Sequence, residues 1–244
     1  MDHREYIRLV PESDTAVLLI HGICGSPAHF RHLLSLIPEN WSVCNLLLDG
    51  HGRNVQDFAA TSMKKWKAQV SRHLEQLRSS HRRVLIAGHS LGTLLAIEEA
   101  IKNSDKIEGL FLLNVPIYVH LPPATMLCAI RSALGMDRYL AVKDMLDDCS
   151  ITLTPRLWEY IGWVPRFCEL LAQTTHIRKL LPNLEVPARC FHSVGDELVS
   201  RRSCPSLEAH PAIKLTLLPQ SGHFQYKGED LQLLQEQFQK WLHE

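Results

Sequence analysis

Short apolar runs recur along the chain and alternate with segments of helical periodicity. The runs are nearly continuous, as in parallel strands that are covered on both faces of a sheet. They predict six strands, over residues 16–20, 42–48, 83–87, 109–113, 188–193 and 213–218.

Helical patterns fill the gaps between these runs. Apolar residues at positions 63, 66, 70, 74 and 77 follow steps of three and four, which define one helix face. Thr61 or Ser62 is placed to cap this helix. Residues 91–103 predict a second helix and residues 231–241 a final amphipathic one. The alternation predicts an α/β fold, with a mostly parallel central sheet flanked by helices.

Residues 115–185 depart from this rhythm, with no strand pattern, several helical fragments and repeated prolines. The stretch is too long for a connecting loop in a compact domain. We therefore predict a helical cap inserted into a core of residues 1–114 and 186–244. Its apolar residues include Ile117, Val119, Leu121, Met126, Leu127, Ile130, Leu134, Met136, Tyr139, Leu140, Trp158, Ile161, Trp163 and Phe167. Most of these are expected to form the cap's own core and its seam with the sheet, and the others the roof of a pocket.

Composition and charge narrow the class of protein. The 244 residues include 26 Lys+Arg and 26 Asp+Glu, so the net charge is zero and nucleic-acid binding through bulk positive charge is disfavoured. With 45% hydrophobic and 21% charged residues, the chain is expected to fold rather than remain disordered. No apolar run reaches the length of a signal core or a membrane span. We expect a cytoplasmic protein without stable membrane insertion.

The cysteine pattern and the absence of cofactor motifs argue against disulfides, bound metals and cofactors. Seven dispersed cysteines without a Cys-x-x-Cys pair favour neither a disulfide framework nor a zinc site, so we interpret them as small buried apolar residues. His-Glu-x-x-His, the P-loop pattern and Gly-x-Gly-x-x-Gly are all absent. The sequence therefore predicts no metal and no cofactor.

A nucleophile motif follows the third predicted strand. Residues 88–92 read Gly-His-Ser-Leu-Gly, and a helix is predicted to begin directly after Ser90. Gly-x-Ser-x-Gly between a strand and a helix places the serine hydroxyl on a tight, exposed turn. Side chains two residues before or after the serine would collide there, which explains both glycines. We predict that Ser90 is a nucleophile.

A serine nucleophile needs a base that a third group orients. Asp196 follows the fifth predicted strand and His223 follows the sixth, in the chain order expected after Ser90. Because the carboxyl ends of parallel strands meet at one edge of the sheet, the three residues are expected to lie together. They are the predicted catalytic triad.

Other residues compete for these roles. Asp49 precedes the serine in the chain, and Asn114 ends the fourth strand but is not an acid. Glu197 neighbours Asp196 and is the second candidate for the acid. The chain has 14 histidines. Those at positions 51, 89 and 210 are interpreted as turn or surface residues.

The loop after the first strand reads His-Gly-Ile-Cys-Gly-Ser over residues 21–26. In the nucleophile-elbow arrangement, one oxyanion donor is the N–H after the nucleophile and the other comes from such a loop. The backbone N–H groups of Ile23 and Leu91 are therefore the predicted oxyanion hole. An ordinary glycine-rich turn is the alternative for the loop.

The motifs follow one another as His-Gly-x-x-Gly-Ser at 21–26, Gly-His-Gly at 50–52, Gly-His-Ser-Leu-Gly at 88–92, Gly-Asp at 195–196 and Gly-His at 222–223. From about residue 16 onward, this series resembles the α/β-hydrolase superfamily, most closely its bacterial carboxylesterase and monoacylglycerol lipase-like branch. The resemblance implies an α/β-hydrolase fold with a variable cap. Esterases, lipases, thioesterases and peptidases share these motifs.

Three hypotheses of function follow. The first is a serine hydrolase that cleaves small carboxylic esters with short- to medium-chain acyl groups, or monoacylglycerol-like esters. The second is a thioesterase, an aminopeptidase-like hydrolase or an acyltransferase that uses the same residues. The third is a binding protein on an inactive hydrolase scaffold, which the presence of Ser90, Asp196 and His223 disfavours.

Overall fold

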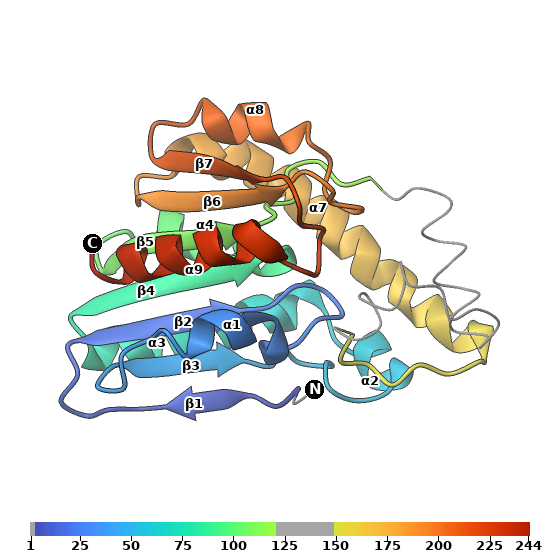
Figure 1. Cartoon of the computed structure of the whole chain (residues 1–244). Coiled ribbons are helices and arrows are strands. Elements are labelled where there is room, and N and C mark those ends of the chain that lie inside the picture. Colours follow the sequence, from blue (N-terminus) through green and yellow to red (C-terminus); the bar gives the residue numbers. More distant parts are fainter. Residues whose placement is uncertain (1–2, 121–148) are drawn as a thin grey trace.

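A computed structural model describes residues 3–120 and 149–244 of the chain. Within these residues, seven strands form one sheet in the spatial order β1-β3-β2-β4-β5-β6-β7 (Figure 1). The strands are β1 (Tyr6–Arg8), β2 (Thr15–Ile20), β3 (Ser42–Leu46), β4 (Arg83–His89), β5 (Ile107–Leu113), β6 (Ala188–Ser193) and β7 (Ile213–Leu218). β1 is antiparallel to β3, and every other neighbouring pair is parallel. The predicted fold class is confirmed.

All six predicted strands are present, with small shifts at their ends. β3 ends at Leu46, two residues earlier than predicted. The N–H of Leu47 donates to the Glu5 carboxylate at 3.2 Å, and that of Leu48 donates to the His21 ring at 3.0 Å. Because these two N–H groups bond to side chains and not to a neighbouring strand, the pairing of β3 ends at Leu46.

The seventh strand, β1, was not predicted. Tyr6 pairs with Asn45 and Arg8 with Val43 at the edge of the sheet. Tyr6 and Ile7 are 40% and 45% exposed. A three-residue edge strand that faces solvent has no buried apolar run, so hydrophobic periodicity does not reveal it.

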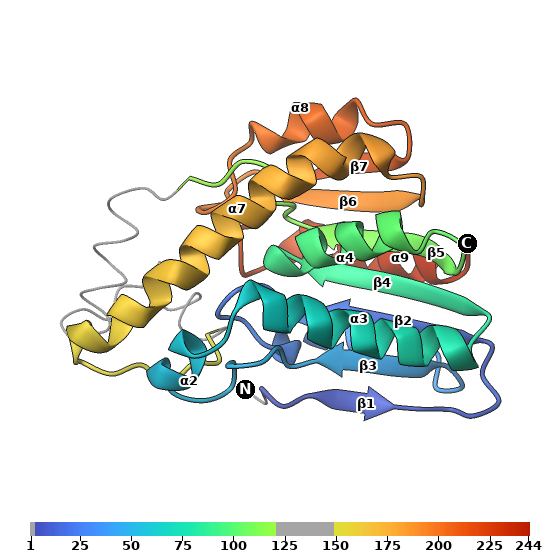
Figure 2. The same cartoon turned by 180° about the vertical axis from the view of Figure 1, so that it is seen from behind.

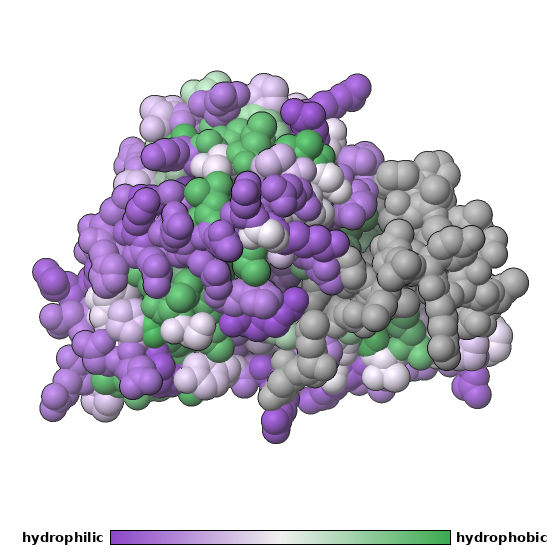
Figure 3. Space-filling view, in the orientation of Figure 1, coloured by the Kyte–Doolittle hydropathy of each residue, from purple (hydrophilic) through white to green (hydrophobic). Residues whose placement is uncertain are grey.

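Helices cover both faces of the sheet. α1 (Arg31–Leu34) and α9 (Gly228–Leu242) lie over the face seen in Figure 1, whose outer surface is mainly hydrophilic (Figure 3). α3 (Met63–Ser80), α4 (Leu91–Lys102) and α7 (Val164–Leu180) lie over the other face (Figure 2). Each face has its own hydrophobic core. The shorter elements are η1 (Pro27–Phe30), α2 (Val55–Ala59), η2 (Leu157–Trp163), η3 (Leu181–Asn183) and α8 (Ser203–Glu208).

The helix after α2 has the predicted buried face. The apolar residues of α3 that are buried are Met63, Trp66, Val70, Leu74 and Leu77. Ser62 is the N-cap, and its hydroxyl accepts the N–H of Lys65 at 3.3 Å. The cap satisfies one of the N–H groups that a helix start leaves without a partner.

The described part of the predicted insertion contains one long helix, α7, between the short helices η2 and η3. α7 buries Leu170, Thr174 and Ile177, and Leu170 and Ile177 belong to the hydrophobic core beneath it. Gln173 donates to the Glu98 carboxylate of α4 at 2.6 Å. The apolar positions from 121 to 140 named above lie outside the described residues. The division of the chain into core and cap stays a prediction.

Candidate active site

Ser90 occupies the turn between β4 and α4 with φ 51° and ψ −119°. A residue with a side chain adopts this conformation only when its surroundings enforce it. Here its N–H donates to the carbonyl of Leu113 at 2.9 Å, and its own carbonyl accepts the Thr93 hydroxyl at 2.6 Å. The Ser90 hydroxyl itself bonds to no residue that the structure describes. Backbone hydrogen bonds thus hold Ser90 in place, while its hydroxyl has no hydrogen-bond partner among the described residues.

The glycines around Ser90 are required by close backbone contacts. A Cβ atom at Gly88 would lie 2.8 Å from the carbonyl of Gly92. One at Gly92 would overlap the carbonyl oxygen of Ile20, and one at Gly22 would lie 3.0 Å from the Ser90 Cβ. The predicted collisions are confirmed, and they extend to the loop that follows β2.

Asp196 and His223 meet as a buried pair. Asp196 Oδ2 lies 2.7 Å from His223 Nδ1, and both side chains are almost fully buried. Asp196 Oδ1 accepts the N–H groups of Leu198 and Val199 at 2.8 and 2.6 Å. Burial alone would raise the pKa of Asp196, but the His223 ring and these N–H groups outweigh it and lower the pKa. The carboxylate is therefore ionised at neutral pH.

Glu197, the second candidate for the acid, makes a different contact. Its carboxylate accepts the backbone N–H of His223 at 2.9 Å. It does not bond to the His223 ring, so Asp196 is the carboxylate that meets the imidazole.

Two side chains hold the backbone carbonyl of His223, and one of them directly precedes Ser90 in the chain. His89 Nε2 lies 2.9 Å from the His223 carbonyl oxygen, and Asn114 Nδ2 donates to the same oxygen at 3.3 Å. Asn114 has φ 54°, and its Oδ1 accepts the Ser193 N–H at 2.8 Å. Since His89 directly precedes Ser90, the bond ties His223 to the turn that carries Ser90. Among the described residues, no hydrogen bond joins the Ser90 hydroxyl to the His223 ring, and such bonds often tighten only when substrate binds.

The two predicted oxyanion donors have free N–H groups. In residues 3–120 and 149–244, neither the N–H of Ile23 nor that of Leu91 donates to another protein group. Leu91 is the first residue of α4, where a helix leaves its N–H without a partner and favours negative charge. Whether both groups meet one substrate oxygen stays a prediction.

The loop that carries Ile23 is a tight turn. Its closing bond runs from the Gly25 N–H to the Gly22 carbonyl at 3.1 Å. His21 Nδ1 lies 2.7 Å from the same carbonyl. Cys24 has φ 58°, and its N–H donates to His51 Nε2 at 3.1 Å.

Five histidines cluster around this site, and all are buried. The rings of His29 and His89 stack with centroids 3.6 Å apart. His89 lies 4.8 Å from His223, and His21 lies 4.8 Å from His51, between ring centroids. Burial excludes a surface position for His51 and His89, whereas His51 does lie in a turn, in which its N–H donates to the Leu48 carbonyl at 3.0 Å. Both positions lie within glycine-containing motifs, which was the signal that they approach the site closely.

Burial lowers the pKa values of four of these histidines. Loss of solvent is the largest cause, and it brings the pKa of His51 to about 4 and that of His89 to about 3. The pKa values of His21 and His29 are also well below 6.5, through burial and then through neighbouring histidines. These rings are neutral at pH 7, so His51 Nε2 can accept the Cys24 N–H.

We expect acid to destabilise the fold through these rings. In the unfolded chain a histidine binds its proton near pH 6.5, whereas folded His51 and His89 bind theirs near pH 4 and pH 3. Stability is therefore full above pH 6.5 and is lost as the pH falls toward 4. For these two residues the free energy of unfolding should fall by on the order of 5 kcal/mol.

Urea unfolding between pH 7.5 and 4.5 measures this loss. A His51→Gln variant should show a smaller dependence on pH, and His243→Gln, which changes an exposed histidine, should show the wild-type dependence. An unfolding free energy that stays constant from pH 7 to pH 5 would contradict the prediction.

The cysteine interpretation is correct only in part. Cys44 and Cys190 are buried, whereas Cys168 is exposed. Cys24, beside Ile23, is half-buried, and burial of its thiol raises its pKa, so the thiol is protonated. Cys128 lies outside the described residues.

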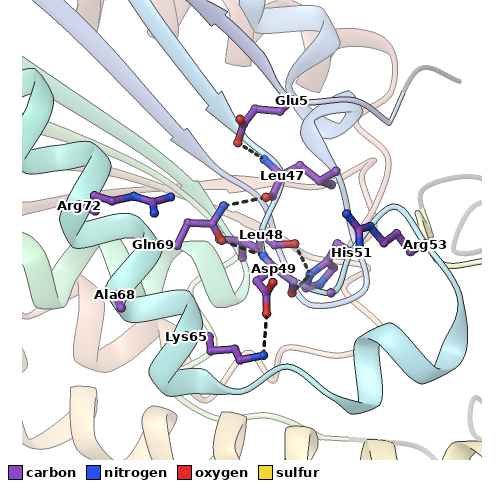
Figure 4. Close-up of a pocket in the computed structure, with 11 residues that line it drawn as sticks. Glu5, Leu47, Leu48, Asp49, His51, Arg53, Lys65, Ala68, Gln69 and Arg72 are labelled. Carbon is purple, nitrogen blue, oxygen red and sulfur yellow. Dashed lines mark hydrogen bonds and ion pairs between the residues drawn. The ribbon is translucent and has the colours of Figure 1, made fainter.

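A surface pocket of about 610 Å³ lies between the loop after β3 and the helix α3, and His51 forms part of its lining (Figure 4). Lys65 and Gln69 of α3 contact the backbone or side chain of Asp49 there. None of the predicted catalytic residues lines this pocket.

The described ranges contain no group of three His, Cys, Asp or Glu side chains that is arranged to hold a metal ion. No helix of residues 3–120 or 149–244 is both long and apolar enough to cross a membrane.

Several known proteins are similar to this chain in sequence or in fold. The thermostable monoacylglycerol lipase of Bacillus sp. (strain H-257) is 29% identical over 102 residues. The match covers 41% of this chain and 40% of the lipase, which is less than half of the length of either protein.

Solved structures match over nearly the whole chain. One of the metagenome-derived lipolytic enzymes LipS and LipT is 20% identical, with a TM-score of 0.77, over 99% of this chain and 97% of that one. The Paleococcus ferrophilus monoacylglycerol lipase is 17% identical, with a TM-score of 0.70, over 99% and 98%. At such identities the likeness shows the fold. A model of the alpha/beta hydrolase family matches residues 17–230. The chain therefore belongs to the alpha/beta hydrolase family.

Proposed function

We propose that the chain hydrolyses carboxylic esters through an acyl-enzyme on Ser90. The substrates are short- to medium-chain acyl esters or monoacylglycerol-like esters. One observation carries the proposal: the His223 ring bonds to the buried Asp196 carboxylate at 2.7 Å, while its backbone is tied to the residue before Ser90. A serine on an enforced turn beside an oriented imidazole is suited to nucleophilic attack on a carbonyl.

In the first half of the proposed reaction, His223 Nε2 takes the proton of the Ser90 hydroxyl as its oxygen attacks the ester carbonyl. Asp196 keeps the other ring nitrogen protonated and stabilises the imidazolium that forms. The N–H groups of Ile23 and Leu91 hold the negative oxygen of the tetrahedral intermediate. His223 then gives its proton to the departing alcohol.

In the second half, water replaces the alcohol. His223 removes a proton from the water, whose oxygen attacks the acyl carbon. As the second tetrahedral intermediate collapses, His223 returns this proton to the Ser90 oxygen, and the free acid leaves. The steps use no metal and no organic cofactor. The lipolytic enzyme and the monoacylglycerol lipases among the similar proteins support ester substrates.

A fluorophosphonate probe tests the proposal directly, because it phosphonylates an activated serine. We expect labelling of Ser90 in the native chain and loss of labelling in the heat-denatured chain. A panel of p-nitrophenyl butyrate, a butyryl thioester and an aminoacyl p-nitroanilide then separates the reactions. Faster turnover of the thioester or the anilide would replace ester hydrolysis with the corresponding alternative. Absence of both labelling and turnover would favour a binding protein.

We expect kcat/KM to rise with acyl length and then to fall. The apolar residues of the predicted cap favour an apolar pocket roof, and each buried methylene adds up to about 0.8 kcal/mol of binding. In p-nitrophenyl esters below their micelle concentrations, the value should increase from acetate to hexanoate or octanoate and decline beyond. Charged acyl groups should be poor substrates.

A matched series of esters with one leaving group isolates this effect. A steady decrease from acetate onward would contradict the apolar roof and would favour a small or polar substrate.

A further inference from the structure

Ser150 joins two loops that follow different strands. Its hydroxyl donates to the carbonyl of Gly25 at 2.6 Å and accepts the N–H of Gly52 at 3.1 Å. Its own N–H donates to the carbonyl of Cys24 at 3.0 Å. Ser150 is only 8% exposed, so water competes little for these bonds. One residue therefore fastens the loop after β2 to the loop after β3.

The loop after β2 needs such support. The left-handed φ of 58° at Cys24 is unfavourable for a residue with a side chain. Both peptide groups of Cys24 are held by hydrogen bonds. The Cys24 N–H donates to His51 Nε2, and the Cys24 carbonyl accepts the N–H of Ser150. Figure 4 shows His51 at the loop after β3, which is the other loop that Ser150 holds. The two contacts act on the same strained residue.

The position of this loop sets the direction of the Ile23 N–H. In a trans peptide, the Gly22 carbonyl and the Ile23 N–H point in opposite directions. The Gly25 N–H fixes that carbonyl through the bond that closes the turn. The Ser150 hydroxyl holds the carbonyl of Gly25. If Gly25 shifted, its N–H would move the Gly22 carbonyl, and the Ile23 N–H of the same peptide group would turn with it.

We propose that Ser150 is a positioning residue that holds the Ile23 N–H in the oxyanion hole. This inference rests on the proposed function of the same site. Ser150 acts on the loop and not on the substrate, and its hydroxyl and N–H hold the carbonyls of Gly25 and Cys24. Its loss should impair stabilisation of the tetrahedral intermediate more than binding of the ester, because the donor matters most when the oxygen is negative.

The test compares Ser150→Ala with the wild type on p-nitrophenyl butyrate. We expect kcat to fall about tenfold, since removal of a whole oxyanion donor costs 10²–10³ and here the donor is only displaced. KM should stay within about twofold. The inhibition constant of phenylboronic acid, whose tetrahedral serine adduct places a negative oxygen in the hole, should rise by about the same factor as kcat falls.

Two variants control for a general structural effect. Ser150→Thr keeps the hydroxyl and should restore most of kcat. Ser13→Ala removes an equally buried serine hydroxyl that also donates to a carbonyl and accepts an N–H, at the start of β2. It should change neither kcat nor the boronate affinity.

The outcomes separate this inference from the proposed function. Wild-type kcat and boronate affinity in Ser150→Ala, with the wild type still labelled at Ser90, would overturn the role of Ser150 alone. An equal loss of kcat in Ser13→Ala and Ser150→Ala, at equal loss of melting temperature, would show a merely structural effect and would also overturn it. No labelling and no ester hydrolysis in the wild type would overturn both.

Discussion

Replacing Ser90 with alanine is expected to abolish ester hydrolysis and fluorophosphonate labelling. The proposed acyl-enzyme cannot form without the hydroxyl, and comparable removal of a nucleophilic serine lowers kcat by about 10⁶. His223 and Asp196 would remain in place but would have no proton to take from a nucleophile. The measurement is initial rates on p-nitrophenyl butyrate, together with labelling followed by mass spectrometry.

The variant should fold as well as the wild type. The Ser90 hydroxyl bonds to no described residue, and the backbone contacts that enforce the turn do not involve its side chain. Thermal unfolding and circular dichroism should therefore be unchanged. Turnover within tenfold of the wild type, in a correctly folded variant, would show that another residue is the nucleophile.

Residues that lie far apart in the chain could be placed together from the sequence because the sheet is parallel. Ser90, Asp196 and His223 follow β4, β6 and β7, whose carboxyl ends lie at one edge. The prediction needed only strand positions and the residues just after them. The structure brings Asp196 and His223 into contact as expected, while their catalytic roles await the experiments above.

Strand positions in the sequence did not show which way a side chain points. Asp196 and Glu197 are neighbours with the same charge, and only the folded loop turns one toward the His223 ring and the other toward its backbone. His51 and His89 likewise lie within glycine-containing motifs, which place them near the site but do not show whether their rings are exposed or buried. Their burial depends on contacts with distant segments, such as the Cys24 N–H on the His51 ring.

Prolines explain why the long helix was not predicted. The repeated prolines of residues 115–185 favour short helical fragments, but Pro165 lies in the first turn of α7 and Pro182 in the first turn of η3. At a helix start the missing N–H of proline costs nothing, because that N–H would have no partner. These prolines mark the beginnings of helices, and α7 runs without interruption from Val164 to Leu180.

Replacing Asp196 with asparagine is expected to lower kcat about 10⁴-fold while leaving the fold intact. Oδ1 of Asp196 accepts two backbone N–H groups, so the oxygen of an asparagine will stay on that side. Its NH₂ group will then face His223 Nδ1, where Oδ2 now lies. A donor at that place requires Nδ1 to be unprotonated, which puts the ring proton on Nε2. His223 can then no longer take the proton of Ser90.

Glu197→Gln is the matched control, since it removes the neighbouring negative charge in the same way. The Glu197 carboxylate accepts the backbone N–H of His223, and the oxygen of a glutamine can accept the same bond. We expect kcat to stay within a few-fold of the wild type. Both variants are measured on p-nitrophenyl butyrate from pH 6 to pH 10, with thermal unfolding as the test of folding. If Glu197→Gln were far more damaging than Asp196→Asn, Glu197 would be the acid that orients His223.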